Sequence, residues 1–273
     1  MSDIENKVQK IIEKSGHDFH SKVSNELRDS GWDVVDSHYY NDPDSGKSRE
    51  IDIIAQKDYK VPNGVFNDGQ EKITIKLFIE CKYINTPTVF WFRPRDIDKA
   101  IKLSKDNEIL NDKGDNYVND GTKHHYVKSD QVAGQWQSEN SDIFAEAQHQ
   151  VLKAMLFFEE NSNRNNYEIS YPILVVNDLS LLFKRDLPPK NHSDINENFQ
   201  IETNYSYKNN KKENITKYFL IDVVTLSMLE NFIEDLESKD IHLLKDSLAY
   251  DLRHQELEME ARYSDETSLD PYE

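Results

Sequence analysis

Two carboxylates and a lysine occur beside two short apolar segments of the chain. Glu80 and Lys82 flank Cys81 in LFIECKY (77–83), and Asp52 lies within REIDIIAQ (49–56). Carboxylates are hard oxygen ligands, and Mg²⁺ prefers one or two of them together with water and phosphate. A metal ion held in this way acidifies a water molecule and neutralises charge on a phosphate. These residue types therefore suit metal-assisted attack of water on a phosphodiester, provided that the fold brings them together.

Lys82 has three chemical roles open to it. It could position the attacking water, act as a general base if its pKa is lowered, or stabilise the charged phosphate. The spacing acid-x-Lys is weak by itself, because Glu5-Asn6-Lys7 and Asp58-Tyr59-Lys60 also fit it. A structural ion pair at the end of a strand remains the alternative interpretation.

The alternation of apolar and polar residues predicts how these groups are positioned. Residues 72–83 alternate strictly, so one face of a strand should carry five apolar side chains, namely Ile73, Ile75, Leu77, Ile79 and Cys81. Glu80 and Lys82 then lie on the opposite face. In the preceding segment Ile51 and Ile53 should oppose Asp52, so pairing the two strands by their core faces brings Asp52 to Glu80 and Lys82. A slip of one residue would reverse this arrangement.

The remaining segments predict an α/β fold, a central mixed sheet flanked by helices. Helical periodicity marks 3–30, 141–161, 226–238 and 240–262, and strand patterns mark 32–40, 49–56, 72–83, 171–177, 180–186 and 217–225. The continuous apolar run at 171–177 is typical of a central strand that is buried on both faces. Residues 85–140 show little periodicity and are interpreted as a functional or mobile insertion.

Composition narrows the class of protein. The 273 residues include 14 Tyr, 12 Phe and 3 Trp, which can supply a core, and a single Cys, which excludes an internal disulfide and a cysteine-based zinc site. No apolar run approaches the roughly 18 residues that are needed to span a bilayer, and the N-terminus has no signal-peptide pattern, so we expect a cytoplasmic protein without a membrane contact. The net charge of −18 argues against a surface that binds nucleic acid everywhere. Residues 1–103 carry only −2 of it (16 Lys and Arg against 18 Asp and Glu), so a polyanion should meet the first part of the chain.

The order helix, strand, strand with Asp52, and strand ending in Glu80-Cys81-Lys82 resembles the PD-(D/E)XK nuclease superfamily. The matching stretches are SREIDIIA (48–55) and FIECKY (78–83), and the stretch from Ser15 to Ala55 is similar to prokaryotic Mrr-like members. The resemblance implies a restriction-endonuclease-like fold and an endonuclease-type hydrolase that uses Mg²⁺, or Mn²⁺ in its place, on DNA. It also implies that Asp52, Glu80 and the backbone carbonyl of Cys81 bind the metal and that Lys82 orients or activates water.

The chain departs from the family pattern in two places. Ile51 precedes Asp52 where the family commonly has Pro, and His20 stands in the first helix where the family has Glu. Glu26, on the same helix, could replace the missing carboxylate only if the helix is rotated relative to the orientation that its apolar residues predict. Gln148 and Gln150 are candidates for the polar residue that relatives project from the helix after the active-site strand, with ordinary helix polarity as the alternative.

Two further groups could touch nucleic acid. Trp91, Arg93 and Arg95 in FWFRPRD (90–96) suit base stacking and phosphate contact, or Trp91 could simply anchor the insertion to the core. His124 and His125 could touch phosphate or metal, but adjacent histidines on a loop seldom converge on one ion, so ordinary loop residues are the preferred interpretation.

We therefore expect a nuclease domain at 1–240, with its insertion at 85–140, and an acidic helical extension and tail at 241–273. The main hypothesis is a Mg²⁺-dependent nuclease acting on DNA. The alternative is a catalytically weak or inactive scaffold that binds nucleic acid or protein within a defence or repair assembly. In either case the acidic extension could serve a homodimer or a partner protein.

Overall fold

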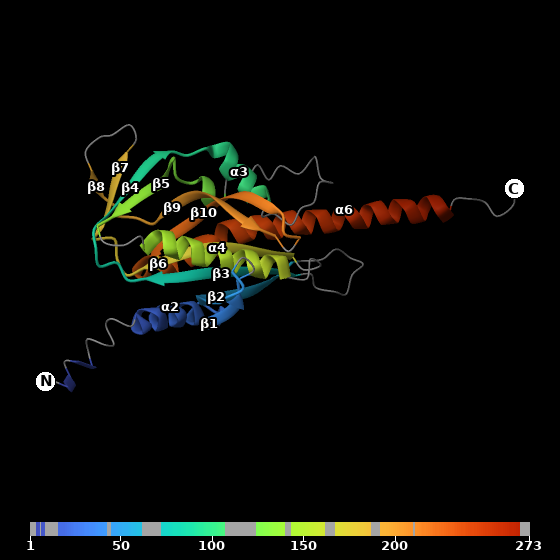
Figure 1. Cartoon of the computed structure of the whole chain (residues 1–273). Helices are drawn as coiled ribbons and strands as arrows, with labels where there is room; N and C mark the ends of the chain where they lie inside the picture. Colours follow the sequence, from blue (N-terminus) through green and yellow to red (C-terminus); the bar gives the residue numbers. More distant parts are fainter. Residues whose placement is uncertain are drawn as a thin grey trace.

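The central feature of the fold is a mixed sheet of ten strands with helices on both faces (Figure 1). The computed structural model describes residues 4–5, 7–8, 16–42, 45–61, 72–106, 124–139, 143–161, 167–186, 192–209 and 211–267. The predicted α/β class is thus confirmed. The turn at 41–48 and the loop at 61–70 lie partly outside the described residues.

The order of the strands in the sheet is β1-β2-β3-β6-β10-β9-β5-β4-β7-β8. Their bounds are β1 Asp33–Asn41, β2 Ser48–Lys60, β3 Lys72–Lys82, β4 Thr88–Pro94, β5 Gln131–Ser138, β6 Tyr167–Val176, β7 Leu182–Asp186, β8 Ser193–Asp194, β9 Phe199–Lys208 and β10 Asn214–Thr225. The first three strands pair antiparallel, and β6 lies parallel to β3 on one side and to β10 on the other. Its apolar run is buried throughout, as predicted for a central strand.

Two apolar clusters cover the two faces of the sheet. One cluster packs α2 (His17–Asp29), α5 (Leu226–Asp235) and the start of α6 (His242–Thr267) against the face that carries Ile73, Ile75, Leu77 and Ile79. The other packs α4 (Ile143–Asn161) against the face that carries Phe78. The alternation in β3 therefore has the predicted phase, and Glu80 shares the α4 face with Phe78.

Residues 88–94 and 131–138 belong to the sheet, as β4 and β5, rather than lying outside it. Of the residues described between them, Ile97–Asp106 form α3 and His125–Val127 form a short 3₁₀ helix, η1. Phe90 and Phe92 are buried in the cluster under α4, whereas Trp91 is half-buried and Arg93 is exposed. The expected insertion thus contributes two strands to the sheet, because the alternating pattern of β4 supplies an apolar face.

The C-terminal helix leaves the body of the protein after its first turns (Figure 1). A π-helical segment, η2 (Leu236–Ile241), joins α5 to α6, and Leu244 and Leu248 are buried in the cluster under α5. Farther along α6, Leu257 and Met259 are exposed. Among the helices within the described ranges, none combines the length and apolarity that a membrane crossing requires.

Candidate active site

The β1–β2 ladder is interrupted at the residue that was expected to act in catalysis. Asp36 pairs with Ile53 and His38 with Ile51, but no pairing joins Ser37 to Asp52, and Ser37 has a φ of 51°. Ile51 then lies in the apolar cluster under α4, and Ile53 lies in the opposite cluster. The expectation that Ile51 and Ile53 share a face is therefore wrong, because the regular pairing of β1 with β2 is broken between Ser37 and Asp52.

This interruption frees Asp52 to bind the end of β3. The ladder between β2 and β3 begins at Ile53 and Ile79, so extending it by one residue places Asp52 opposite Glu80. The backbone N–H of Cys81 donates a 2.8 Å hydrogen bond to Asp52 Oδ2, and the backbone of Asp52 faces the Glu80 carboxylate closely enough to favour its charged form. Asp52 and Glu80 are thus held side by side by reciprocal backbone contacts.

Glu80 is a buried acid whose second oxygen has no hydrogen-bond partner. Its side chain is 1% exposed, Oε2 accepts from Lys82 Nζ at 2.8 Å, and Oε1 accepts no hydrogen bond from any described residue. Burial, together with the nearby charge of Asp52, raises the pKa of Glu80 to about 7, although Lys82 opposes this shift. An orphaned buried oxygen of this kind costs stability unless a ligand or a proton satisfies it.

Lys82 is held between a carboxylate and an amide. Its Nζ donates to Glu80 Oε2 and, at 3.1 Å, to Gln150 Oε1 on α4. Burial alone would lower the pKa of Lys82, but the charges of Glu80 and Asp52 outweigh this effect and raise it. Lys82 is therefore an ammonium group in this arrangement, which suits positioning and charge stabilisation better than proton abstraction.

The residues present fit a hard divalent cation. Asp52 and Glu80 offer carboxylate oxygens at the junction of two strands, and Glu80 Oε1 is buried without a donor. The N–H and C=O of one residue in a strand point toward the same neighbouring strand. Since the N–H of Cys81 reaches Asp52, the carbonyl of Cys81 is directed to the same side. These are the ligand types that Mg²⁺ prefers.

The buried Glu80 predicts a pH-dependent stability for the metal-free protein. Because its pKa lies near 7 in the folded state and near 4.5 ordinarily, the folded state binds more protons between these values. The free energy of unfolding should therefore fall by roughly 3 kcal/mol as the pH rises through this window. Urea unfolding in EDTA at several pH values would measure the fall. Glu80→Gln should remove it, and an unchanged pH dependence in that variant would contradict the assignment.

Helix α2 presents a different partner from the one that the resemblance implies. His20 Nε2 lies 3.6 Å from Asp36 Oδ1 on β1, and Ser24 and Arg28 also bind the Asp36 carboxylate. Ser24 and Arg28 lower the pKa of Asp36 although burial opposes them. The stripe at positions 20, 24 and 28 thus fixes a third acid near the site. No hydrogen bond or ion pair given for the described residues links Glu26 to Asp52, Glu80 or Lys82.

The two candidate glutamines of α4 have different partners. Gln148 Nε2 donates to Thr203 Oγ1 on β9 at 3.0 Å, so the expectation that Gln148 reaches the site is wrong. Gln150 instead reaches Lys82. Residues that are two positions apart on a helix point in directions that differ by about 200°. Only one of these two side chains can therefore face the end of β3.

The candidate nucleic-acid residues lie far from Asp52 and Glu80. Strands β6, β10, β9 and β5 separate β3 from β4, which is roughly 24 Å at the usual strand spacing. Arg93 forms an ion pair with Glu202, and Arg95 is 6% exposed. Arg95 Nε donates to the Ser129 carbonyl at 2.6 Å, so its side chain is not available to phosphate.

Arg95 should therefore affect stability rather than nucleic-acid binding. It also donates to the Gln131 carbonyl at 3.1 Å, and charged hydrogen bonds of this kind contribute about 1.5–3 kcal/mol each. Arg95→Met, which keeps most of the side-chain volume, should lower the free energy of unfolding by about 2 kcal/mol. Loss of DNA affinity with unchanged stability would contradict this role. Arg185→Met, at an exposed position on β7, provides the matched control.

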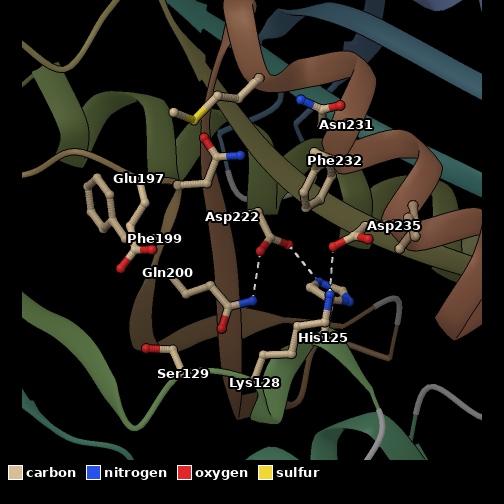
Figure 2. Close-up of a pocket in the computed structure, with 13 residues that line it drawn as sticks. His125, Lys128, Ser129, Glu197, Phe199, Gln200, Asp222, Asn231, Phe232 and Asp235 are labelled. Carbon is tan, nitrogen blue, oxygen red and sulfur yellow. Dashed lines mark hydrogen bonds and ion pairs between the residues drawn. The ribbon is translucent and has the colours of Figure 1, made fainter.

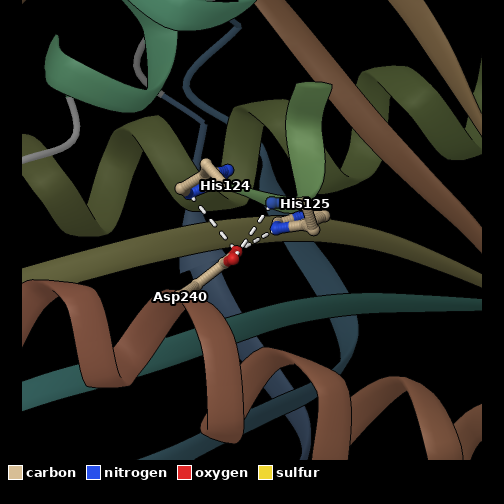
Figure 3. A group of neighbouring side chains, drawn as sticks. All are labelled: His124, His125 and Asp240. Atoms are coloured by element: carbon tan, nitrogen blue, oxygen red, sulfur yellow. Dashed lines mark hydrogen bonds and ion pairs between the residues drawn. The ribbon is translucent and has the colours of Figure 1, made fainter. Parts of the chain in front are cut away.

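His124 and His125 do converge on one group, contrary to the loop interpretation (Figure 3). Their ring nitrogens and Asp240 lie within 4.8 Å of one another, so the three buried side chains could hold a metal ion. The hydrogen bonds nevertheless occupy each ring. The Tyr126 N–H donates to His124 Nδ1 at 3.1 Å, which leaves the proton on Nε2, facing Asp240. His125 lies between the carboxylates of Asp240 and Asp222.

This second cluster holds a buried imidazolium. Burial alone would lower the pKa of His125, but Asp240 and Asp222 raise it to about 10, whereas burial lowers the pKa of His124 to about 3. His125 therefore donates from both ring nitrogens, and its charge offsets part of the charge of the two acids. The adjacent pair HH was the only sequence signal, and the distant acids at 222 and 240 could not be assigned to it in advance.

Comparisons of the chain with protein-family models, curated proteins and solved structures found no match.

Proposed function

We propose that this chain is a Mg²⁺-dependent nuclease with a restriction-endonuclease-like fold, and that its substrate is DNA. The observation that carries the proposal is the junction of β2 and β3, where Asp52 and Glu80 are held by reciprocal backbone contacts beside the Lys82 ammonium. The orphaned Oε1 of Glu80 adds to this support, since a cation would satisfy it.

Each residue has a role that follows from its environment. Asp52, Glu80 and the Cys81 carbonyl would hold Mg²⁺, which supplies Lewis-acid activation of water and of the phosphate. Lys82 is protonated and lies beside Glu80, so it can orient water and stabilise the negative charge that develops on the phosphate. Gln150 accepts a hydrogen bond from Lys82 and restricts its direction. Glu80 and Lys82, two residues apart on one strand, can meet the same phosphate.

The test is a cleavage assay with purified full-length protein. Linear and circular, single- and double-stranded DNA, with RNA in parallel, would be incubated with Mg²⁺, with Mn²⁺ and with EDTA. We expect cleavage of DNA in the presence of either metal and none in EDTA. The absence of cleavage of every substrate would contradict the proposal.

A catalytically weak or inactive scaffold is the second candidate. Two observations favour it. Lys82 forms an ion pair with the buried Glu80. His20, which contacts Asp36, occupies the position at which the family has a catalytic carboxylate. Such a scaffold would bind DNA or a partner protein without cutting, and α6 with its acidic side chains is its candidate docking element. DNA binding in a gel-shift assay without cleavage, or a native mass above that of one chain, would favour this candidate.

A further inference from the structure

A buried aspartate at the end of β1 holds two cations on the α4 side of the sheet. The side chain of Asp42 is fully buried, and its Oδ2 accepts from Lys153 Nζ of α4 at 2.8 Å. The same oxygen lies 3.5 Å from Arg49 Nε of β2 and accepts from Ser45 Oγ at 2.8 Å. Because one carboxylate serves two cations, this group of side chains carries one positive charge in excess.

Arg49 is the more exposed of the two cations. Its side chain is 47% exposed, against 24% for Lys153. Nε faces Asp42, and no hydrogen bond given for the described residues uses Nη1 or Nη2. A guanidinium that is held through Nε presents its terminal N–H groups as a planar fork, which is the geometry that binds a phosphate through two parallel hydrogen bonds.

Tyr40 connects Arg49 with the junction of β2 and β3. It pairs with Arg49 across the β1–β2 ladder and is buried in the cluster under α4. Burial raises the pKa of Tyr40, the charges of Asp42 and Glu80 raise it further, and Arg49 lowers it. The phenol of Tyr40 is therefore close to both Glu80 and Arg49. Along β2, Arg49 precedes Asp52 by three residues, roughly 10 Å of strand.

Helix α4 makes a second connection between the same two places. Gln150, which accepts from Lys82, and Lys153 are three positions apart and are neighbours on the helix surface. Lys82, Lys153 and Arg49 thus form a row of cations that extends from the end of β3 to the β1–β2 hairpin. A strand of DNA with one phosphate at Lys82 can place a neighbouring phosphate at Arg49.

The cations beside the His125 cluster do not offer such a contact. A cavity of about 630 Å³ lies next to His125 (Figure 2). Lys128 Nζ donates to Asp235 at 2.8 Å, and His125 lies between the carboxylates of Asp222 and Asp240. Since carboxylates already offset these charges, the cavity is a poor site for a phosphate.

We propose that Arg49 binds a backbone phosphate of DNA next to the phosphate that is cleaved. Asp42 positions the guanidinium of Arg49, and Lys153 adds a second positive charge. The inference depends on the proposed nuclease function, which supplies the phosphodiester, and it adds the residue that holds the uncleaved part of the strand. The contact with DNA is thereby assigned to β2 instead of to Arg93 and Arg95 of the β4 region.

The test is a titration of the full-length protein with a short labelled DNA duplex in EDTA, followed by fluorescence anisotropy. EDTA removes the metal, so the titration measures binding without cleavage. Arg49→Gln should weaken binding roughly tenfold, about 1.4 kcal/mol. It should also make the dependence of log K on log[salt] less steep by about 0.9, the value for one phosphate contact. Arg49→Lys, which keeps the charge but not the fork, should restore the salt dependence and only part of the affinity.

Arg185→Gln provides the matched control, because Arg185 is an exposed arginine on β7, at the other end of the sheet. It should bind DNA within about twofold of the wild type and with the same salt dependence. The proposal is overturned if the wild type does not bind the duplex, or if Arg49→Gln binds as Arg185→Gln does. A lower melting temperature of Arg49→Gln with unchanged DNA affinity would likewise show that Arg49 only stabilises the hairpin.

Cleavage in Mg²⁺, assayed separately, distinguishes the failure of this proposal from that of the nuclease proposal. Cleavage by the wild type, combined with unchanged affinity in Arg49→Gln, would contradict the role of Arg49 alone. Weaker binding in Arg49→Gln without cleavage by the wild type would support the contact between Arg49 and DNA and contradict the nuclease. Circular dichroism of each variant would verify that it is folded before titration.

Discussion

Asp52→Asn is expected to reduce Mg²⁺-dependent cleavage of DNA about a thousandfold, because it removes one of the two charges that would hold the metal. The asparagine keeps an oxygen that can accept the hydrogen bond from the Cys81 N–H, so the junction of β2 and β3 should remain intact. Cleavage rates at saturating Mg²⁺, together with thermal unfolding of the variant, separate loss of chemistry from loss of fold.

Asp58→Asn is the matched control on the same strand. Asp58 pairs with exposed Lys72 at 2.7 Å and with Thr74 at 2.7 Å, six residues along β2 from Asp52. Its replacement should leave cleavage within about twofold of wild type, since an exposed ion pair contributes little. If Asp52→Asn cuts as fast as Asp58→Asn does, Asp52 has no part in the reaction.

Asp240→Ala is expected to destabilise the protein by about 3–5 kcal/mol, because it leaves His125 buried without one of its two carboxylates. Asp240 accepts from the backbone N–H of His125 at 3.0 Å and from its ring, and its side chain is fully buried. The loss therefore combines an unpaired charge with an unsatisfied backbone donor. Urea unfolding measures the effect, and Asp240→Asn, which keeps an acceptor oxygen, should cost less.

Asp235→Ala gives the corresponding surface control. Asp235 binds Lys128 and Lys239 at 2.8 Å and 2.6 Å, but its side chain is 50% exposed. Because water screens such pairs, this change should cost less than about 1 kcal/mol. Equal losses in Asp235→Ala and Asp240→Ala would show that burial of the His125 cluster contributes nothing to stability.

The part of the fold that the sequence predicts well is local and strongly periodic. The alternation from Ile73 to Lys82 assigns both faces of β3 correctly, because each apolar side chain in turn meets a buried surface. The same reasoning fails one strand earlier, where the pairing of β1 with β2 is broken at Asp52 and Ile51 and Ile53 lie on opposite sides of the sheet. Ser37 has a positive φ at this break, and serine is not a residue type that predicts such a backbone conformation.

The strands that were missed pair with distant partners. β4 and β5 lie beside β7 and β9, and their place in the sheet depends on contacts across more than fifty residues. Phe90 and Phe92 alternate with Trp91 and Arg93, so the pattern of residues 88–94 does predict a strand. The long, polar stretch that follows it favoured the interpretation of an insertion.

The candidate site was only partly predictable for a related reason. The junction of Asp52 with Glu80 follows from strand pairing, whereas the choice between Gln148 and Gln150 depends on how α4 is rotated about its axis. Buried residues lie on several sides of α4, including Phe144, Ala147, Val151 and Leu152, so its pattern does not define one inward face. Only the packed structure assigns Gln150 to Lys82 and Gln148 to β9.

The most direct measurement of the metal-binding site is a crystal structure from protein crystals soaked in Mn²⁺, in which anomalous scattering locates the metal. We expect a peak bound at about 2.2 Å by carboxylate oxygens of both Asp52 and Glu80. Lys82 should lie beside it without ligating. A peak at His124, His125 and Asp240 alone, or no peak at the end of β3, would show that Asp52 and Glu80 do not form the metal site.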